Sequence, residues 1–378
     1  MTAYFDNAST TAVCREAADK SLEMMTDNYA NPSSLHAAGR RAKEALEEAR
    51  RVTAGALGAA PGELFFTSGG TESNNRAVIF GALGAARRGK HIISSKAEHD
   101  SVLKAVDLLE SRGFEVTRLS PERDGSIAPQ AVEEAIRKDT ALISLMLVNN
   151  ETGAITDIAA VSEALKRLSS QALLHTDAVQ AFLKIPFSAA DLGADLISVS
   201  GHKVHAPKGV GALFARKGVS LPPMLVGGEQ ENSKRAGTEA TPMICAFGEA
   251  VRVGAGSFVE DARRMRELRG LAESRLKGEI PGLIVTGGGA PHILCVSLPG
   301  HKSETLMNFL ESKGVYVSKS SACKKGGRSH VLEAIGLPGK VIDGSLRISF
   351  SRRSGRGETD YLCDRLKEAD ESLITCLS

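Results

Sequence analysis

The sequence contains no tryptophan, and aromatic residues make up only 4% of it. A protein with so few aromatic side chains is not expected to bind partners through an aromatic-rich face. A large charge of one sign is also absent, because 47 Lys and Arg residues stand against 45 Asp and Glu residues and leave a net charge of +2. This balance gives no electrostatic reason to expect nucleic acid or an acidic membrane surface as a partner.

The chain also lacks a long apolar run. The longest one, around residues 142–148, is far shorter than the roughly 18 residues that suggest a membrane-spanning helix. Its first residues include Asp6, Arg15 and Lys20, and the apolar core of an export signal does not contain such charges. We therefore expect a cytoplasmic protein that does not contact a membrane.

Six cysteines are scattered over the chain, and no two of them form a Cys-x-x-Cys pair. This spacing argues against a disulfide framework and against a zinc knuckle, and it fits a reducing compartment. We expect no metal site. The cysteines are Cys14, Cys245, Cys295, Cys323, Cys363 and Cys376.

Helical and strand patterns alternate along most of the 378 residues, a length that suggests two or three domains. The apolar run at residues 141–148 is typical of a strand covered on both faces. The alternation predicts an α/β fold, with a mostly parallel sheet between layers of helices. We expect strands at residues 63–67, 91–94, 114–119, 141–148, 172–175 and 195–198, and helices at residues 37–57, 101–112, 128–138 and 159–168.

The pattern changes near residue 250. Residues 251–277 form a long, charge-rich helical pattern, and two separated strand patterns follow at residues 293–298 and 345–350. We assign residues 13–250 to a large, ligand-binding domain. We assign residues 251–378, together with residues 1–12, to a smaller α+β domain.

Polar clusters follow the expected strands, and ligands of open parallel sheets bind beyond the carboxyl ends of strands. The first cluster, residues 68–75, has glycines that permit close backbone approach and a helix start that suits an anion such as phosphate. The Thr71 hydroxyl adds a donor, although an ordinary capped helix has the same pattern. The second cluster holds Asp177, which can cap a helix, bind a metal or pair with a cationic ring nitrogen.

The third cluster ends in Lys203, within the run Ser-Gly-His-Lys after a strand. A desolvated lysine near other positive charge loses its proton and can form a Schiff base, whereas most lysines simply lie on the surface. Together, a phosphate cradle, Asp177 and Lys203 follow one another on one parallel sheet. This arrangement describes a pyridoxal phosphate site, in which the carboxylate keeps the pyridine nitrogen protonated.

These motifs resemble the cysteine desulfurases, within the class V aminotransferase-like branch of fold-type I pyridoxal phosphate enzymes. The resemblance covers essentially the whole chain. It implies a fold-type I transferase with a large and a small domain, pyridoxal 5'-phosphate as cofactor, and a homodimer with shared sites. The matching motifs lie at residues 4–11, 31–34, 68–75, 98–99, 148–153, 177–180, 200–203, 235–238, 320–323 and 346–349.

The resemblance also implies roles for single residues. Lys203 is implied to hold the cofactor covalently, Asp177 to pair with the pyridine nitrogen, and His99 to stack on the ring and help to move protons. Cys323 is implied to be the sulfur-accepting nucleophile. The other implied cofactor contacts are Gly70, Thr71, Asn150, Gln180, Ser200, His202 and, from the other subunit, Thr238; the implied substrate-binding residues are Asn31, Asn150 and Arg347.

The neighbours of Cys323 support a reactive thiol. A lone cysteine is usually a small buried hydrophobe. Here the surrounding segment is polar and contains glycine, which predicts an exposed and mobile loop in the small domain. Lys324, Lys325 and Arg328 favour the thiolate form, which is the nucleophile. The other five cysteines stand in apolar or helical patterns, and we interpret them as structural.

The implied activity converts L-cysteine to L-alanine and leaves a persulfide on Cys323 for an acceptor such as an iron–sulfur scaffold or a tRNA-thiolation enzyme. Selenocysteine lysis or another small-amino-acid reaction on the same fold is the nearest alternative. A non-catalytic scaffold and a nucleotide-binding enzyme are others, although residues 68–70 lack the spacing of known nucleotide loops. The chain departs from the family pattern at Ala206 and Ala240 and in the short segment after Cys323.

Overall fold

Seven strands form the central sheet of the computed structural model, which describes residues 2–320 and 327–373. They lie in the order β2-β8-β7-β6-β5-β3-β4, and only β8 runs antiparallel to its neighbours. The predicted mostly parallel sheet is therefore confirmed. The strands are β2 (Leu64–Thr67), β3 (His91–Ser95), β4 (Glu115–Leu119), β5 (Thr140–Met146), β6 (Leu173–Asp177), β7 (Leu196–Ser200) and β8 (Gly211–Ala215).

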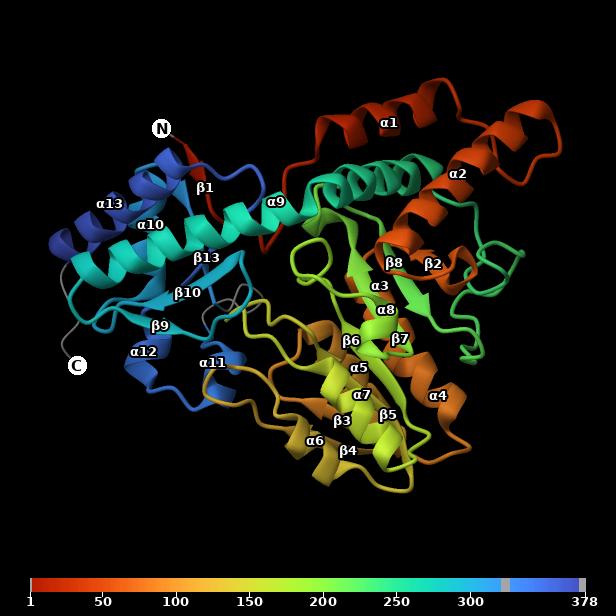
Figure 1. Ribbon diagram of the computed structural model, residues 1–378, viewed down its shortest axis with the longest axis horizontal. Helices are drawn as coiled ribbons and strands as arrows, with labels where there is room; N and C mark the ends of the chain where they lie inside the picture. Colours follow the sequence, from red (N-terminus) through yellow and green to blue (C-terminus); the bar gives the residue numbers. More distant parts are fainter. Residues whose placement is uncertain (1, 321–326, 374–378) are drawn as a thin grey trace.

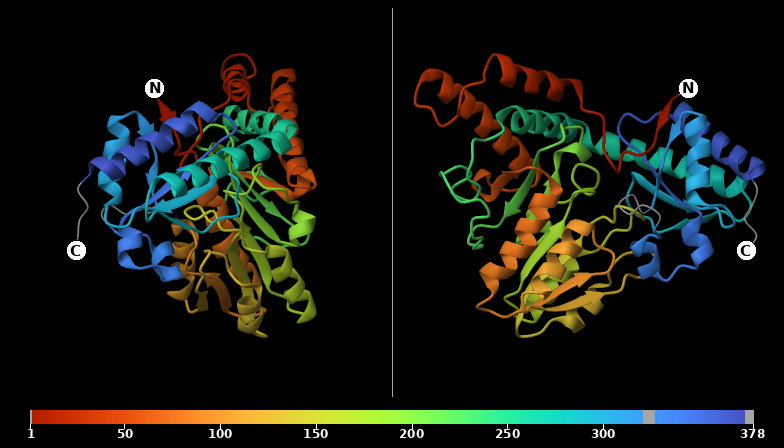
Figure 2. Two further views of the ribbon diagram at one scale, coloured as in Figure 1. Left: turned by 60° about the vertical axis from the view of Figure 1, so that its left-hand side comes forward. Right: turned by 180° about the vertical axis from the view of Figure 1, so that it is seen from behind.

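Helices cover both faces of this sheet (Figures 1 and 2). Every residue of β5, β6 and β7 is buried, as expected for strands between two helical layers. A continuous helical stretch begins after β2 as α3 (Gly70–Asn75) and ends as α4 (Gly81–Ala85). The other helices of this body are α1 (Arg15–Thr26), α2 (Ala37–Ala56), α5 (Asp100–Glu110), α6 (Pro129–Ala135), α7 (Ile158–Arg167) and α8 (Ala189–Leu192), with a 3-10 turn at Gly201–Lys203.

A second, smaller body contains a four-stranded sheet in the order β12-β13-β10-β9, in which all pairs are antiparallel. The short strand β1 (Ala3–Tyr4) joins it by pairing with β11 (Val315–Tyr316), so the start of the chain packs here. Its remaining elements are β9 (Ile284–Thr286), β10 (Ile293–Ser297), β12 (Ser318–Lys319), β13 (Ser345–Ser349), α10 (Ser303–Ser312), α11 (His330–Ile335), α12 (Gly339–Asp343) and α13 (Arg356–Ser372).

One helix of 39 residues, α9 (Thr241–Glu279), joins the two bodies (Figure 1). Its first half contributes Phe247 and Val251 to the core of the large sheet, and its second half contributes Leu268 and Leu276 to the core of the small one. The boundary expected at residue 250 therefore falls inside a continuous helix. The division into domains at that residue stays a prediction.

The main differences from the expected elements are local. α9 begins at Thr241 instead of residue 251, with Pro242 in its first turn, where proline fits a helix without losing a hydrogen bond. Helix α1 and strand β8 were not predicted. Strand β8 was missed because it is a short apolar run directly behind the polar Lys203 cluster. No helix in the described part of the chain is both long and apolar enough to cross a membrane.

Candidate active site

A cavity of about 370 Å³ lies at the carboxyl edge of the large sheet. Strands β2, β3, β5, β6 and β7 all point toward this edge, so the segments that follow them converge there. The ends of these strands and the segments that follow them supply most of the lining, and the N-terminal segment and β13 of the small sheet supply the rest. Ten of the residues expected from the sequence line the cavity: Gly70, Thr71, His99, Asn150, Asp177, Gln180, Ser200, His202, Lys203 and Arg347.

Lys203 enters the cavity from the 3-10 turn directly after β7. Its Nζ donates hydrogen bonds to the carbonyl oxygens of Ala8 at 2.6 Å and Ser9 at 2.7 Å. These carbonyls belong to the N-terminal segment, which follows β1 in the smaller body and then reaches the large one, where the Thr11 N–H donates to the His202 carbonyl. The side-chain amine is thereby held among the residues that line the cavity.

Asp177 is the last residue of β6 and only 4% exposed. Its Oδ2 accepts a hydrogen bond from Asn74 Nδ2 at 2.6 Å, and its Oδ1 accepts one from the Val179 N–H at 2.9 Å. Burial raises the pKa of Asp177, and these two hydrogen bonds partly oppose the rise. A cationic group bound in the cavity would supply the charge that favours the ionised carboxylate.

The other end of the cavity suits a phosphate. A side-chain carbon added to Gly70 would lie 2.9 Å from Val179 Cγ2 and 3.5 Å from Ser200 Cβ, so this cradle admits only glycine without rearrangement. Ser200 Oγ is buried and has no hydrogen-bond partner among the described residues. Burial lowers the pKa of His202 to about 4, which keeps its ring neutral. An anion at the start of α3 would meet the Ser200 hydroxyl and the N–H groups of the first helical turn.

His99 caps the start of α5. Its Nδ1 accepts a hydrogen bond from the Ser101 N–H at 3.1 Å and lies 2.8 Å from Ser101 Oγ. Because the Ser101 N–H can only donate, the neutral ring carries its hydrogen on Nε2. The capping contact thus determines both the ring's place and its tautomer.

Arg347 reaches the cavity from β13, and its side chain is 3% exposed. Its guanidinium donates to the Asn150 carbonyl at 2.9 Å, to Asp6 Oδ1 at 2.9 Å and to Ser9 Oγ at 2.6 Å. Its Nε is buried and meets no partner in the part of the chain that the structure describes. A planar guanidinium in this position is suited to hold a ligand carboxylate.

Three expected residues do not line this cavity. Asn31 is exposed, and its Oδ1 caps a local turn by accepting from the Ser33 N–H at 2.9 Å. Thr238 is exposed on the loop between β8 and α9; Arg235 of that loop pairs with Glu72 at 2.6 Å beside the phosphate end. Cys323 lies outside the described residues.

Sequence reasoning missed several contributors to the site. Asn74 lies four positions after Gly70 in the polar cluster already singled out, and this helical spacing could have identified it as a second side chain on the same face. Ser101, two residues after His99, has the ordinary signal of a capping partner. The carbonyls of Ala8 and Ser9 have no signal at all, because every residue carries one. The departure at Ala206 is accommodated, since this residue is 1% exposed in the large core.

The other cysteines of the described part of the chain, Cys14, Cys245, Cys295 and Cys363, are all buried. Burial raises the pKa of Cys245 and of Cys363 to about 12, and it raises that of Cys295 as well. Thiols of this kind are poor nucleophiles near neutral pH. Their placement agrees with the structural interpretation.

Comparison with known proteins agrees with the fold and the lining of the cavity. The sequence profile of the aminotransferase class-V family matches residues 3–362. The chain belongs to this family, on its cysteine desulfurase branch.

Its relatives identify that branch. The cysteine desulfurase IscS of Methanosarcina thermophila is 41% identical over 376 residues, which cover 98% of this chain and 92% of the relative. The cysteine desulfurase IscS of Dictyoglomus turgidum is 39% identical, with 98% and 95% covered. A solved NifS-like protein superposes with a TM-score of 0.93 at 34% identity and covers 99% of this chain and 100% of its own. The structure of SspA in complex with cysteine gives 0.81 at 33% identity, with 94% and 100% covered.

Proposed function

We propose that this protein is a pyridoxal phosphate-dependent cysteine desulfurase, which converts L-cysteine to L-alanine and retains the sulfur as a persulfide on Cys323. The observation that carries the proposal is the convergence of a lysine amine, a buried aspartate and a buried arginine on one cavity of about 370 Å³. The many relatives named cysteine desulfurase support the same activity.

The described residues fit the cofactor along its whole length. Ser200, His202 and the start of α3 at Gly70 and Thr71 would hold the phosphate group. Asp177 would pair with the pyridine nitrogen and Gln180 with the ring oxygen, while His99 would face the ring. When bound, pyridoxal phosphate withdraws electrons from the carbon that carries the substrate's amino group.

The remaining chemistry belongs to side chains of this chain. Lys203 would anchor the cofactor covalently, and its Nζ would accept the proton of the substrate's α carbon once the amine is released. His99, whose Nε2 carries a hydrogen, would donate a proton within the same cavity. Arg347 and the Asn150 side chain would orient the substrate through its carboxylate.

Sulfur transfer needs a nucleophilic thiol. The Cys323 thiolate would form an S–S bond with the sulfur of the substrate while the C–S bond of the substrate breaks. The products are L-alanine and a persulfide, so no outside oxidant is required. An acceptor protein, such as an iron–sulfur scaffold or a tRNA-thiolation enzyme, would then take the terminal sulfur.

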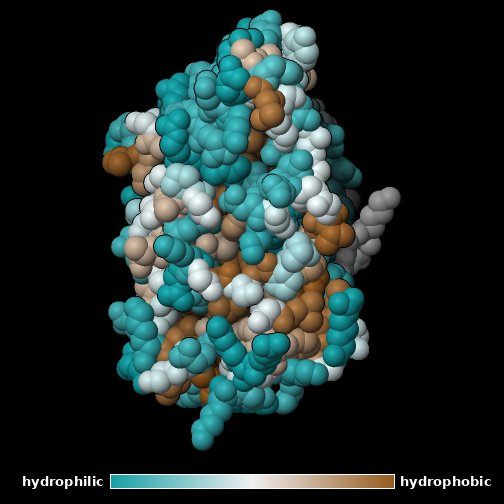
Figure 3. Space-filling view, turned by 90° about the vertical axis from the view of Figure 1, so that its right-hand side faces the viewer, coloured by the Kyte–Doolittle hydropathy of each residue, from teal (hydrophilic) through white to brown (hydrophobic). Residues whose placement is uncertain are grey.

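We further propose that the active unit is a homodimer in which Thr238 of one subunit serves the site of the other. Thr238 is exposed, and the apolar side chain of Val226 on the same loop is 84% exposed. Figure 3 shows apolar patches among hydrophilic residues on the face that carries the loop between β8 and α9. Apolar groups gathered in this way favour contact with another protein surface.

The test of the activity is release of alanine from L-cysteine in the presence of a thiol reductant. We expect release by the parent protein, loss of release with Cys323→Ala, and retained release with the buried-cysteine control Cys245→Ala. Absence of release from the parent, when it is yellow with bound cofactor, would contradict the proposal. Release that persists in Cys323→Ala would point instead to the selenocysteine type of reaction.

The test of the shared site is a mixture of two variants, each with lowered activity. Lys203→Ala and Thr238→Ala should each lower activity when alone. A mixed dimer contains one site with an intact lysine and an intact threonine from the partner. Recovery of activity on mixing and refolding would support sharing, and a mixture no more active than its components would contradict it.

A further inference from the structure

Gln180 is surrounded by buried donors that the proposed reaction does not use. Its Oε1 lies 3.4 Å from Lys184 Nζ and 3.4 Å from His292 Nε2, while its own Nε2 donates to the Ala8 carbonyl at 2.8 Å. Gln180 is 3% exposed, Lys184 is 6% exposed and His292 is fully buried. Lys184 follows Gln180 in the loop after β6, and His292 stands just before β10 of the small sheet. The cluster thus joins the two bodies behind the site.

These contacts determine which way round the Gln180 amide stands. An amide oxygen can only accept hydrogen bonds, and an amide nitrogen can only donate them. In the reversed orientation the oxygen would face the Ala8 carbonyl and the nitrogen would face the Lys184 amine, so the first contact would always be repulsive and the second would be repulsive whenever the amine is protonated. The NH₂ group therefore stands on the Ala8 side, where both residues line the large cavity. It has a second N–H beyond the one that Ala8 accepts.

The states of the two donors agree with this orientation. His292 Nε2 must carry its hydrogen to donate to Gln180, and His292 Nδ1 is left as a buried acceptor with no partner within residues 2–320 and 327–373. Burial lowers the pKa of His292 well below its usual value, so the ring is a neutral donor. Burial, with help from Lys203 and Arg347, lowers the pKa of Lys184 to about 7. A lysine amine carries N–H groups in both of its protonation states, so the contact survives this titration.

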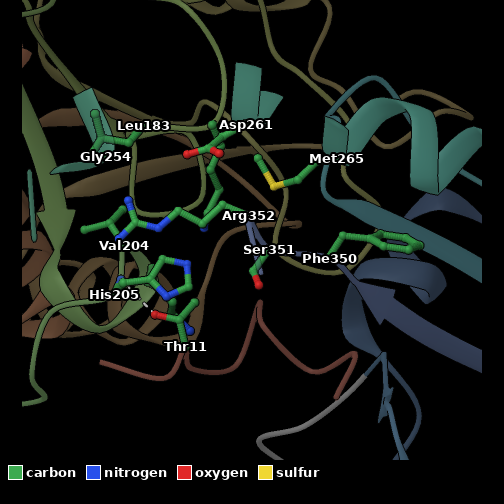
Figure 4. Close-up of a pocket in the computed structure, with 12 residues that line it drawn as sticks. Thr11, Leu183, Val204, His205, Gly254, Asp261, Met265, Phe350, Ser351 and Arg352 are labelled. Atoms are coloured by element: carbon green, nitrogen blue, oxygen red, sulfur yellow. Dashed lines mark hydrogen bonds between the residues drawn. The ribbon is translucent and has the colours of Figure 1, made fainter. Parts of the chain in front are cut away.

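Lys184 also borders a second, much smaller cavity of about 30 Å³ between α9 and the end of β13 (Figure 4). This volume has room for about one water molecule and not for a substrate. The titratable groups around it include His205, Asp261, Arg352 and Lys203, and Arg269 lies near His292. A purely structural role at this junction is the alternative that an experiment must separate.

We propose that Lys184 and His292 are positioning residues that hold the carbonyl of Gln180 and thereby aim its NH₂ group at the ring oxygen of the cofactor. The proposal rests on the cofactor assignment made above. A donor aimed at an oxygen that can ionise favours its ionised form. Removing either positioning residue releases the amide and makes the ring oxygen harder to ionise.

The experiment is a pH titration of the visible absorbance of the bound cofactor, without substrate. We expect Lys184→Met and His292→Leu each to raise the proton affinity of the coloured group about tenfold, the size expected when one hydrogen bond to a charged group is weakened. His292→Gln retains an N–H donor and should restore the parent titration. Lys104→Met, at a lysine whose side chain is 76% exposed, is the matched control and should change nothing.

A double substitution separates positioning from structure. If Lys184 acts through Gln180, Lys184→Met should cause no further change once Gln180→Leu is present. An equal change in both backgrounds, or an unchanged titration in folded Lys184→Met and His292→Leu, would overturn the proposal. If Lys184→Met fails to fold, the comparison of His292→Leu with His292→Gln tests the proposal by itself. Failure of the cofactor assignment itself would appear separately, as a parent protein that stays colourless with pyridoxal phosphate.

Discussion

The phosphate cradle at Gly70 predicts how strongly a substitution there should weaken cofactor binding. In Gly70→Ala the new carbon would lie 2.9 Å from Val179 Cγ2, which is closer than real side-chain carbons approach. Val179 lines the cavity, so relief of this contact moves its methyl group toward the space in which the cofactor would bind. Forcing one extra carbon into a well-packed site costs about 1–3 kcal/mol.

This free-energy cost should appear mainly as weaker binding of the cofactor. At about 1.4 kcal/mol per tenfold change in affinity, Gly70→Ala should weaken pyridoxal phosphate binding roughly 5- to 140-fold. The assay is titration of the apoprotein with cofactor, followed by absorbance, with thermal unfolding of the apoprotein measured in parallel.

The matched control is Gly270→Ala, at an exposed position of α9 where an added carbon meets no atom of the described residues within 4 Å. It should leave cofactor affinity unchanged and stabilise the helix slightly, because alanine loses less backbone freedom than glycine. If folded Gly70→Ala binds the cofactor as tightly as the parent, the phosphate end has been placed wrongly.

Three further predictions concern separate groups. Lys203→Ala should lose the covalent cofactor label that borohydride reduction and peptide mapping place on the parent, and a label found on another lysine would contradict the assignment. Arg347→Lys should raise the KM for L-cysteine about 10- to 100-fold while cofactor absorbance persists, because one planar guanidinium makes three hydrogen bonds to two segments; an unchanged KM would remove it from the substrate site. His175 is held between two serine hydroxyls, and burial lowers its pKa from 6.5 to about 3. Between these two pH values the unfolded chain therefore binds a proton at His175 that the folded protein does not bind. The free energy of unfolding should fall by up to about 5 kcal/mol as pH drops from 6.5 to about 3. His175→Gln should flatten this slope in urea unfolding; an identical slope in both proteins would refute the assignment.

Most of the large sheet could be predicted from the sequence. Its central strands are continuous apolar runs bounded by polar turns, and runs as short as these favour strands over helices. Strand β8 escaped prediction because its five residues, Gly211–Ala215, form a short apolar run directly behind the polar cluster of Lys203. The start of α9 escaped because apolar residues of its first half are buried all round, so the amphipathic pattern appears only further along.

The side chains of the site were predictable wherever they follow a strand. Asp177, Ser200 and Lys203 stand at strand ends, and parallel strands bring their carboxyl ends to one edge. Arg347 was identified only through family resemblance. It stands inside a strand of the other sheet, and no local pattern tells that its guanidinium faces the cavity.

The sequence by itself determined the kinds of chemistry that are available, because lysine, aspartate, histidine and arginine carry their reactivity wherever they stand. It also determined the parallel sheet, through the spacing of its apolar runs. Only the tertiary structure decided the environment of each group. The Ala8 carbonyl accepts hydrogen bonds from both Lys203 and Gln180, although most strands of the large sheet lie between Ala8 and these residues in the sequence. His292 contacts Gln180 from the smaller body. Long-range contacts of this kind depend on how two cores pack against one helix, and local sequence patterns do not predict that packing.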